Sequence, residues 1–348
     1  MKKKIIFIFI IVSIAFACKK TTANGGGATI PPVVTPPVTD SVFAKGADIS
    51  WLTQMETDGR KFYSSAGTEQ DCMQILKDLG MNSIRLRVWV NPTNGWCNTA
   101  DMVAKAIRAK ALGMKILLDF HYSDSWADPG KQTKPATWVG QDFATLKQSI
   151  TTHTTSVLNA LKTHGIIPAW VQIGNETNNG MLWPDGKASA NMNNFAQLEN
   201  AGYDAVKAVD TSIKIIIHIS NGYDNSLFRW MFDGLKSNGA KWDIIGMSLY
   251  PTATNWSILN TQCLANMNDM VLRYGKDIMI VEIGLGWVDA SACNSFISDL
   301  ISKVKSVNGK RGLGVFYWEP ESYNNWQGYS LGAFDNSGKP TIALNAFK

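Results

Sequence analysis

Charge is sparse in this sequence of 348 residues: only 18% are charged, and no basic stripe runs along the chain. Three positive charges, Lys2, Lys3 and Lys4, lie at the N-terminus, and without them the formal net charge of +5 falls to +2. Because nucleic-acid recognition depends on clustered positive charge, the sequence excludes nucleic acid as an expected partner.

Long apolar runs are missing except at the N-terminus, where residues 5–16 follow the three lysines and precede Ala17-Cys18. A basic start, an apolar stretch and a small residue are typical of a secretory signal peptide. A cysteine directly after such a stretch resembles the lipobox of bacterial lipoproteins, so we predict a signal peptide over 1–17 and lipidation of Cys18. The alternative is an ordinary cleaved signal with an incidental cysteine.

No other apolar run reaches the ~20 residues that a membrane span requires. The membrane is therefore an expected partner only through the lipid anchor. We expect an exported protein anchored to a bacterial membrane, the outer one, although the sequence does not say which face displays it. Residues 18–41 are rich in Pro, Gly and Thr, which predicts an extended tether.

Metal-site spacing is also absent, since the five cysteines form no Cys-x-x-Cys pair and have no nearby histidine. We therefore expect no metal and no cofactor. Four cysteines follow the tether, and an exported protein permits disulfides. Two alternatives stay open: the pairs Cys72–Cys97 and Cys263–Cys293, or four buried free thiols.

Residues 42–348 alternate between apolar runs and amphipathic segments, and we predict one domain and a monomer. The helical spacing i, i+3, i+4, i+7 appears in Cys72, Ile75, Leu76 and Leu79, for example. Eight such units favour an α/β fold, a single (β/α)8 TIM barrel. The alternative, an open doubly wound sheet, usually has a glycine-rich loop after its first strand, and this sequence has none there. The predicted strands are 44–50, 82–90, 115–123, 168–176, 213–220, 243–251, 277–284 and 313–320.

Polar side chains lie at the ends of all eight predicted strands, where barrels carry their active sites. Glu176 and Glu282 stand out because each follows an apolar run and neither has a neighbouring Lys or Arg. Their strands lie on roughly opposite sides of the barrel, so the two carboxyl groups can meet across its mouth. Hydrolysis of a glycosidic bond needs such a pair, one protonated and one ionised. The alternative is a buried salt-bridge network.

Neighbouring residues fit this division of roles. We expect Asn175 to bind a sugar hydroxyl, and Tyr250 and Arg85 to keep Glu282 ionised. Asp48 is expected to pair with Arg85 or Arg87. The 13 tryptophans suit a cleft in which sugars stack on aromatic rings.

Several blocks of this sequence resemble one known family. They are GADISWL, SIRLRVWVNP, DFHYSDSWADPGKQTKPATW, VQIGNETNNGMLWPDG, the strand with His218, and GMSLYP. They resemble glycoside hydrolase family 53, the endo-β-1,4-galactanases of clan GH-A, over nearly all of residues 43–348. The resemblance implies that Glu176 is the acid/base and Glu282 the nucleophile. It also implies internal cleavage, with retention, of the β-1,4-galactan in type I arabinogalactan and pectin.

The residues that we predict to bind substrate are Asp48, Arg85, Asp119, His121, Tyr122, Asp124, Trp126, Asn175, His218, Tyr250, Trp287 and Trp318. For His218 a core role is the alternative. Some family members bind calcium in long loops, but only residues 288–294 separate Trp287 from the next helix, which argues against a calcium site here.

Two other functions remain open at this point. One is another clan GH-A endoglycanase, a β-mannanase or endoglucanase, and the other is a non-catalytic glycan-binding lipoprotein. Product length and tolerance of arabinose branches also stay open.

Overall fold

The computed structural model describes residues 42–348. The predicted signal peptide, the lipidated Cys18 and the tether lie outside the described residues. Among the described helices, none is both long and apolar enough to cross a membrane.

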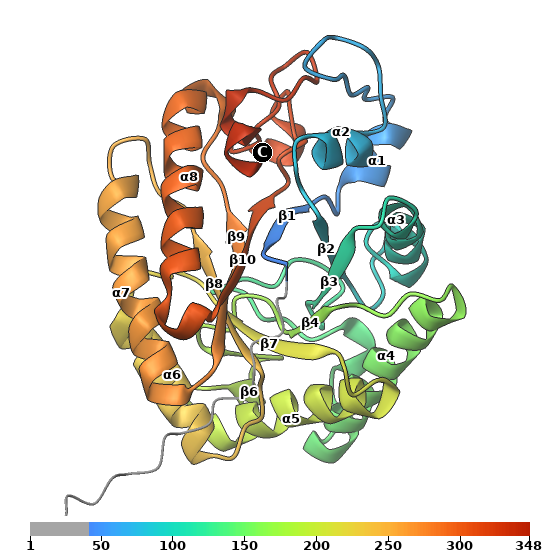
Figure 1. Ribbon diagram of the computed structural model, residues 1–348. Coiled ribbons are helices and arrows are strands. Elements are labelled where there is room, and N and C mark those ends of the chain that lie inside the picture. The colour runs from blue at the N-terminus through green and yellow to red at the C-terminus, as the bar shows by residue number, and fades with distance from the viewer. Residues whose placement is uncertain (1–41) are drawn as a thin grey trace, which may run out of the picture. The chain divides into compact units, whose positions relative to one another are not determined.

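Eight parallel strands close into a barrel in the order β1-β10-β9-β8-β7-β4-β3-β2, with β2 pairing back onto β1 (Figure 1). Helices alternate with the strands along the chain, so the predicted (β/α)8 fold is confirmed. The barrel strands are β1 (Ala44–Asp48), β2 (Ser83–Val88), β3 (Lys115–Phe120), β4 (Trp170–Ile173), β7 (Lys214–Ile219), β8 (Ile244–Leu249), β9 (Asp277–Ile283) and β10 (Gly312–Trp318).

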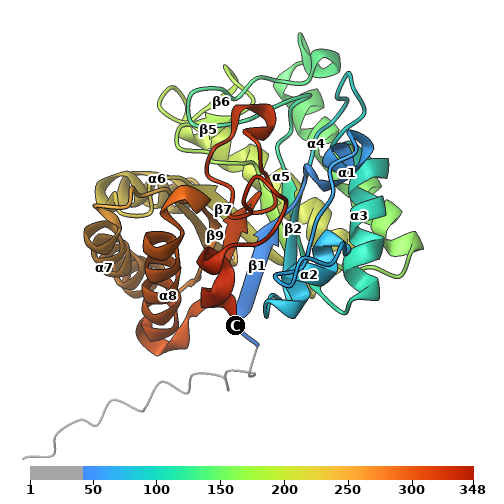
Figure 2. The ribbon, with the colours of Figure 1, turned by 90° about the horizontal axis from the view of Figure 1, so that it is seen from above.

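The helices surround the barrel, with α6, α7 and α8 on one side of the strands and α2, α3 and α4 on the other (Figure 2). Asp71, Asn98 and Asp142 cap three helices by accepting a backbone N–H with the side chain. The α-helices are α1 (Leu52–Thr57), α2 (Cys72–Asp78), α3 (Thr99–Ala111), α4 (Phe143–Thr163), α5 (Met192–Val209), α6 (Asn225–Ser237), α7 (Trp256–Tyr274) and α8 (Ala290–Ser306).

Short elements lie in the connecting loops. A two-stranded hairpin, β5 (Gly180–Met181) and β6 (Gly186–Lys187), follows β4. The 3-10 helices are η1 (Ala136–Trp138), η2 (Trp287–Asp289), η3 (Asn308–Lys310), η4 (Trp326–Gly328) and η5 (Ile342–Phe347).

The strands are apolar because both of their faces are buried. Side chains that point inward, among them Leu117, Ile216 and Phe316, form a small core separate from the large one between strands and helices. Gly46 shows how tightly the inner core is packed, since a Cβ atom there would lie 2.2 Å from the ring of Phe316. Close packing below the mouth leaves the strand ends as the place for polar side chains.

The cysteines 72, 97, 263 and 293 are four buried free thiols. Of the two alternatives left open by the sequence, the structure shows the free thiols and not the pairs Cys72–Cys97 and Cys263–Cys293. Burial raises the pKa of Cys263 and Cys293 to about 12, which keeps both thiols protonated and unreactive.

Candidate active site

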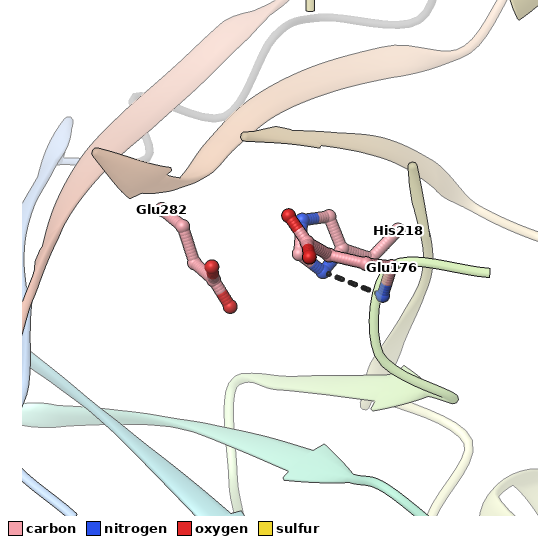
Figure 3. A group of neighbouring side chains, drawn as sticks. All are labelled: Glu176, His218 and Glu282. Carbon is pink, nitrogen blue, oxygen red and sulfur yellow. Dashed lines mark hydrogen bonds between the residues drawn. The ribbon is translucent and has the colours of Figure 1, made fainter. Parts of the chain in front are cut away.

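Glu176 and Glu282 face each other at the mouth of the barrel (Figure 3). One carboxylate oxygen of each and one ring nitrogen of His218 all lie within 4.8 Å of one another. Glu282 belongs to β9, whereas Glu176 lies beyond the end of β4, where Gly174 and Glu176 adopt positive φ angles of 74° and 42°. A positive φ is uncommon for a residue such as Glu, so the backbone departs from its usual geometry to present this carboxyl group.

Glu282 is bound by two donors. Arg85 on β2 contacts Oε1 at 2.8 Å, and the Tyr250 hydroxyl donates to Oε2 at 3.0 Å. Tyr250 is exposed elsewhere along its side chain, but burial around the hydroxyl and the nearby Glu282 charge raise its pKa well above the usual range. The hydroxyl therefore keeps its proton and donates. The structure thus places both residues where the sequence predicted them, in contact with Glu282.

Arg85 connects Glu282 to two further acids. It is only 1% exposed, and it pairs with Asp48 at 2.6 Å and with Asp119 at 2.9 Å. The pairing of Asp48 with Arg85 is one of the two that the sequence predicted. Asp48 is fully buried, so it has no surface for direct contact with substrate, and that part of the prediction is wrong. A buried salt-bridge network thus does lie under the mouth; within residues 42–348 it includes Glu282 and forms no ion pair with Glu176.

Glu176 has a different environment. Its Oε1 accepts a hydrogen bond from the Ser248 hydroxyl on β8 at 2.7 Å. Burial raises the pKa of both Glu176 and Glu282, and the charge of Glu176 raises that of Glu282 further. The Arg85 charge opposes this rise at both groups, but of the two it forms its ion pair with Glu282, at 2.8 Å. Two carboxyl groups this close do not both ionise easily, so the pair retains one proton near neutral pH. Because the guanidinium favours the ionised form of Glu282, we place that proton on Glu176.

His218 on β7 completes the cluster, and its ring is fully buried. Three such groups at this spacing could ligate a metal ion. Both ring nitrogens already have hydrogen-bond partners, and the Arg85 charge lies 2.8 Å from Glu282. Positive charge next to the cluster opposes a cation, so we read the three residues as a proton-handling group.

Asp119 and His121 differ from the prediction that they recognise substrate hydroxyl groups. They are 0% and 2% exposed, and Asp119 Oδ2 contacts His121 Nε2 at 3.0 Å. The other ring nitrogen, Nδ1, accepts the N–H of Ala127 at 3.1 Å. Both residues therefore hold Arg85 and the loop after β3 in place, and the prediction of direct contact is wrong for them.

Tyr122 and Asp124 were also predicted to bind substrate, and the structure gives both another role. The Tyr122 side chain is fully buried among helices, and its hydroxyl is 2.7 Å from Thr154 of α4. Alternation along β3 explains this, because Leu117 and Asp119 point into the barrel and Tyr122 points out. Asp124 accepts the N–H groups of Asn91 and Ala136 at 2.9 and 2.8 Å and so joins two loops.

Asn175 lies next to Glu176 and is held at both ends of its amide. Its Nδ2 donates to the carbonyl of Ala127 at 2.8 Å, and its Oδ1 accepts from Arg85 at 2.9 Å. Gln172 on β4 contacts the same Oδ1 at 3.2 Å. Asn175 is thus fixed in orientation beside the carboxyl pair.

An aromatic cavity of about 360 Å³ opens on the same face of the barrel. Trp126 and Trp318, which we predicted to bind substrate, line it together with Trp51 and Tyr329, which the sequence analysis did not single out. Trp318 packs edge-on against Tyr329, with ring centroids 4.6 Å apart. Trp287 lies elsewhere: it lines a second cavity of about 430 Å³ that also has Tyr329 in its wall.

Arg87 and Glu319 form the support behind this cavity. They are fully buried and paired, and the guanidinium lies 4.4 Å from the centre of a Trp126 ring. Sequence reasoning missed Ser248 and Gln172 as site residues, because a single serine or glutamine in an apolar strand carries no distinguishing signal.

Comparison with known proteins gives one consistent family. The model of Glycosyl hydrolase family 53 matches residues 44–295 and 288–347. A probable arabinogalactan endo-beta-1,4-galactanase A from Neosartorya fischeri is 37% identical over 310 residues, which cover 82% of this chain and 86% of the relative.

Two solved structures are similar over most of their length. One, from work on two fungal beta-1,4-galactanases, has a TM-score of 0.82 and 32% identity, covering 87% of this chain and 98% of its own. The other, the GH53 catalytic domain of Ignisphaera aggregans, has a TM-score of 0.81 and 32% identity, covering 91% of this chain and 99% of its own.

Proposed function

Because this chain belongs to glycosyl hydrolase family 53, we propose that it is an endo-β-1,4-galactanase that cleaves β-1,4-galactan with retention of configuration. The observation that carries this proposal is the facing pair of unequal carboxyl groups. Retaining enzymes hold the two groups about 5–5.5 Å apart, and inverting enzymes leave roughly 6.5–9.5 Å for a water molecule. A separation within 4.8 Å between oxygens of Glu176 and Glu282 fits the retaining geometry.

In the first step, Glu176 donates its proton to the glycosidic oxygen while Glu282 attacks the anomeric carbon. The leaving chain departs as an alcohol, and the other part of the substrate becomes covalently bound to Glu282 through an ester. In the second step, ionised Glu176 removes a proton from water, which attacks the same carbon and releases Glu282. Two inversions at one carbon give net retention.

The remaining residues support this chemistry in our proposal. Arg85 and Tyr250 keep Glu282 ionised for attack, since both donate to its carboxylate. Trp318 forms the floor of the sugar site next to the scissile bond, and Trp126 adds a second ring to the aromatic cavity. Asn175 contributes a sugar contact beside Glu176.

A panel of polysaccharides tests the substrate. Purified enzyme is incubated with potato galactan, carob mannan and carboxymethylcellulose, and new reducing ends and product sizes are measured. We expect release from galactan, with internal cleavage producing a range of oligosaccharides. Release from mannan or carboxymethylcellulose without release from galactan would favour another clan GH-A endoglycanase.

Variants of the carboxyl pair test catalysis against mere glycan binding. We expect Glu176→Ala and Glu282→Ala each to abolish turnover of galactan while binding to it survives. Glu69→Ala is the matched control, because this carboxylate is exposed and pairs only with Lys61. A wild-type protein that binds galactan without cleaving it would support the non-catalytic alternative.

We further propose that the protein is exported, anchored through Cys18 to the outer membrane, and monomeric. The support for export and anchoring is the sequence of residues 1–41, in which a basic start and an apolar stretch typical of a signal peptide precede Cys18 and a segment rich in Pro, Gly and Thr. Detergent-phase partitioning of the wild type, Cys18→Ser and the control Lys19→Ala tests the anchor. We expect only Cys18→Ser to leave the detergent phase, and light scattering of the detergent-free Cys18→Ser protein measures the oligomeric state.

A further inference from the structure

Ser248 lies between two groups of the site that do not otherwise connect through their side chains. Its hydroxyl oxygen is 2.7 Å from Oε1 of Glu176 and 2.6 Å from Nε2 of His218. A hydroxyl group has one proton, so it can donate to only one of these two neighbours. The three groups form a chain of hydrogen bonds, and the direction in which its protons point depends on which nitrogen of His218 carries a proton.

The surroundings of Nδ1 decide that question. The backbone N–H of Glu176, a donor that cannot be reversed, contacts Nδ1 at 3.3 Å, as the dashed line in Figure 3 marks. The side-chain nitrogen of Gln172 is also a donor: one of its two protons goes to Asp119 at 2.5 Å, and Nδ1, at 3.0 Å, is the nearest of the remaining acceptors. One acceptor, Oδ1 of Asn175, lies at 3.1 Å and would favour the other arrangement. Two donors against one acceptor leave Nδ1 unprotonated.

The ring of His218 is neutral, because burial and then the charge of Arg85 hold its pKa well below the usual range. A neutral ring with a bare Nδ1 carries its proton on Nε2. That proton goes to the Ser248 oxygen, and the Ser248 proton goes to Oε1 of Glu176. The chain runs in one direction, from His218 through Ser248 to Glu176.

We propose that Ser248 is a positioning residue for the acid/base: its hydroxyl donates to Oε1 of Glu176 in both protonation states and so confines the catalytic proton to Oε2. An oxygen that accepts a hydrogen bond from Ser248 is not the oxygen that carries the proton. The acid proton therefore occupies the other oxygen, which has no hydrogen-bond partner among residues 42–348 and is left for the glycosidic oxygen. This inference rests on the proposed role of Glu176.

Several charged or titratable groups face Glu176 from other elements, and none of them donates a hydrogen bond to its carboxyl oxygens. They are Arg85 from β2, Asp119 from β3, Asp128 from the following loop, His218 from β7, Tyr250 from β8 and Glu282 from β9. Ser248 is thus the one side chain in the described part of the chain that orients this carboxyl group by direct contact.

The direction of the chain fixes the sign of a pH effect. A hydrogen bond donated to a carboxylate stabilises its ionised form and lowers its pKa. Removing the Ser248 hydroxyl therefore raises the pKa of Glu176. In a retaining enzyme the alkaline limb of kcat/KM reports loss of the acid proton, so this limb moves to higher pH. If the chain ran the other way, from a protonated Glu176 to Ser248, the limb would move to lower pH.

The test compares Ser248→Ala with Ser83→Ala in the full enzyme. Ser83 is the matched control, since it is also buried in a barrel strand but bonds to Asn82 at the opposite end of the barrel. We expect Ser248→Ala to move the alkaline limb up by on the order of 0.5–1 pH unit, the worth of one hydrogen bond. Ser83→Ala leaves the limb in place.

Aryl β-glycosides of galactobiose give a second readout, because a good leaving group needs no proton from the acid. We expect Ser248→Ala to lower kcat/KM about 10-fold for galactan and less than about 2-fold for the 2,4-dinitrophenyl glycoside, as for partial loss of general acid catalysis. Equal losses for both substrates would indicate a merely structural role and overturn the inference. An alkaline limb of kcat/KM that stays in place, or moves to lower pH, in Ser248→Ala would also overturn the inference.

Glu176→Ala separates this inference from the assignment on which it rests. If Glu176 is the acid/base, this variant loses galactan cleavage but still forms the glycosyl-enzyme from the dinitrophenyl glycoside. If Glu176→Ala does not behave in this way, the acid/base role of Glu176 is wrong. If it does, and the alkaline limb of kcat/KM does not move in Ser248→Ala, only the role of Ser248 is wrong. Nitrogen-15 NMR of wild-type His218 serves if Ser248→Ala does not fold: a protonated Nε2 supports the inference, and a protonated Nδ1 overturns it.

Discussion

Replacing Tyr250 by Phe removes one of the two donors to Glu282 and nothing else. The hydroxyl donates to Oε2 at 3.0 Å, and Glu282 is only 5% exposed, so water does not readily take its place. A hydrogen bond to a charged group contributes about 1.5–3 kcal/mol. We use about 1.5 kcal/mol, because Arg85 remains bound to the other oxygen and Tyr250 is 37% exposed.

The sign follows from which form of Glu282 the hydroxyl stabilises. The donor favours the carboxylate, so its loss raises the pKa of Glu282, by about one unit for 1.5 kcal/mol. The nucleophile must be ionised, and the acidic limb of kcat/KM therefore moves to higher pH by about one unit. Below that limb the variant is about 10-fold slower than the wild type, and the difference shrinks as pH rises.

The assay is the initial rate of galactan cleavage from pH 3 to 9. Tyr274→Phe is the matched control, because its hydroxyl also donates to a carboxylate, Asp233 at 2.9 Å, but on the outer helices. We expect the control to keep the wild-type profile. An acidic limb that does not move, or that moves down, would show that Tyr250 does not keep Glu282 ionised, and the division of roles within the pair would need revision.

Two further predictions concern residues outside the reaction. Tyr122→Phe leaves the Thr154 hydroxyl without its partner, so we expect calorimetry to show a loss of about 1–2 kcal/mol of stability, with kcat/KM on galactan within 2-fold of the wild type; a large loss of kcat/KM in a folded variant would restore Tyr122 to the substrate site. Burial raises the pKa of Glu199 well above its usual range, and neither carboxyl oxygen has a hydrogen-bond partner in the described part of the chain. Glu199 thus folds in its neutral form, which costs stability increasingly as pH rises above ~4.3, the ordinary pKa of a glutamate. Glu199→Gln avoids that cost, so we expect its gain in melting temperature to grow from pH 5 to pH 8 and to vanish near pH 4; a gain independent of pH, or one matched by Glu69→Gln, would contradict this reasoning.

The barrel was predictable because its strands are buried on both faces and therefore appear as isolated apolar runs. Each of the eight predicted runs overlaps one strand of the closed barrel. The predicted ends of the strands were less accurate where the backbone turns away from the direction of the strand. β4 stops at Ile173, and two of the next three residues, Gly174 and Glu176, adopt positive φ angles that no sequence periodicity predicts.

The carboxyl pair was predictable because a glutamate without a neighbouring Lys or Arg is unusual at the end of an apolar strand. Asp119, His121 and Tyr122, all buried, were misassigned because the whole block around the end of β3 was interpreted as one recognition surface. Alternation along the strand would have separated Tyr122 from Asp119, since they point to opposite faces.

Loop geometry limited the prediction of the aromatic residues. Trp287 follows β9 and Trp318 ends β10, yet they line different cavities, and Trp51 and Tyr329 join Trp318 in one of them. Which loop residue reaches which cavity depends on turns without a repeating pattern, so the sequence offered candidates but no grouping.

Trapping the covalent intermediate tests the central claim most directly. The enzyme is treated with a 2-deoxy-2-fluoro galactobioside that has a good leaving group, so that the glycosyl-enzyme forms quickly and hydrolyses slowly, and the digest is analysed by mass spectrometry. We predict a fluorinated disaccharide on the peptide that contains Glu282, and no label in Glu282→Ala. A label on another residue, or active turnover with an inverted product and no label at all, would contradict the account.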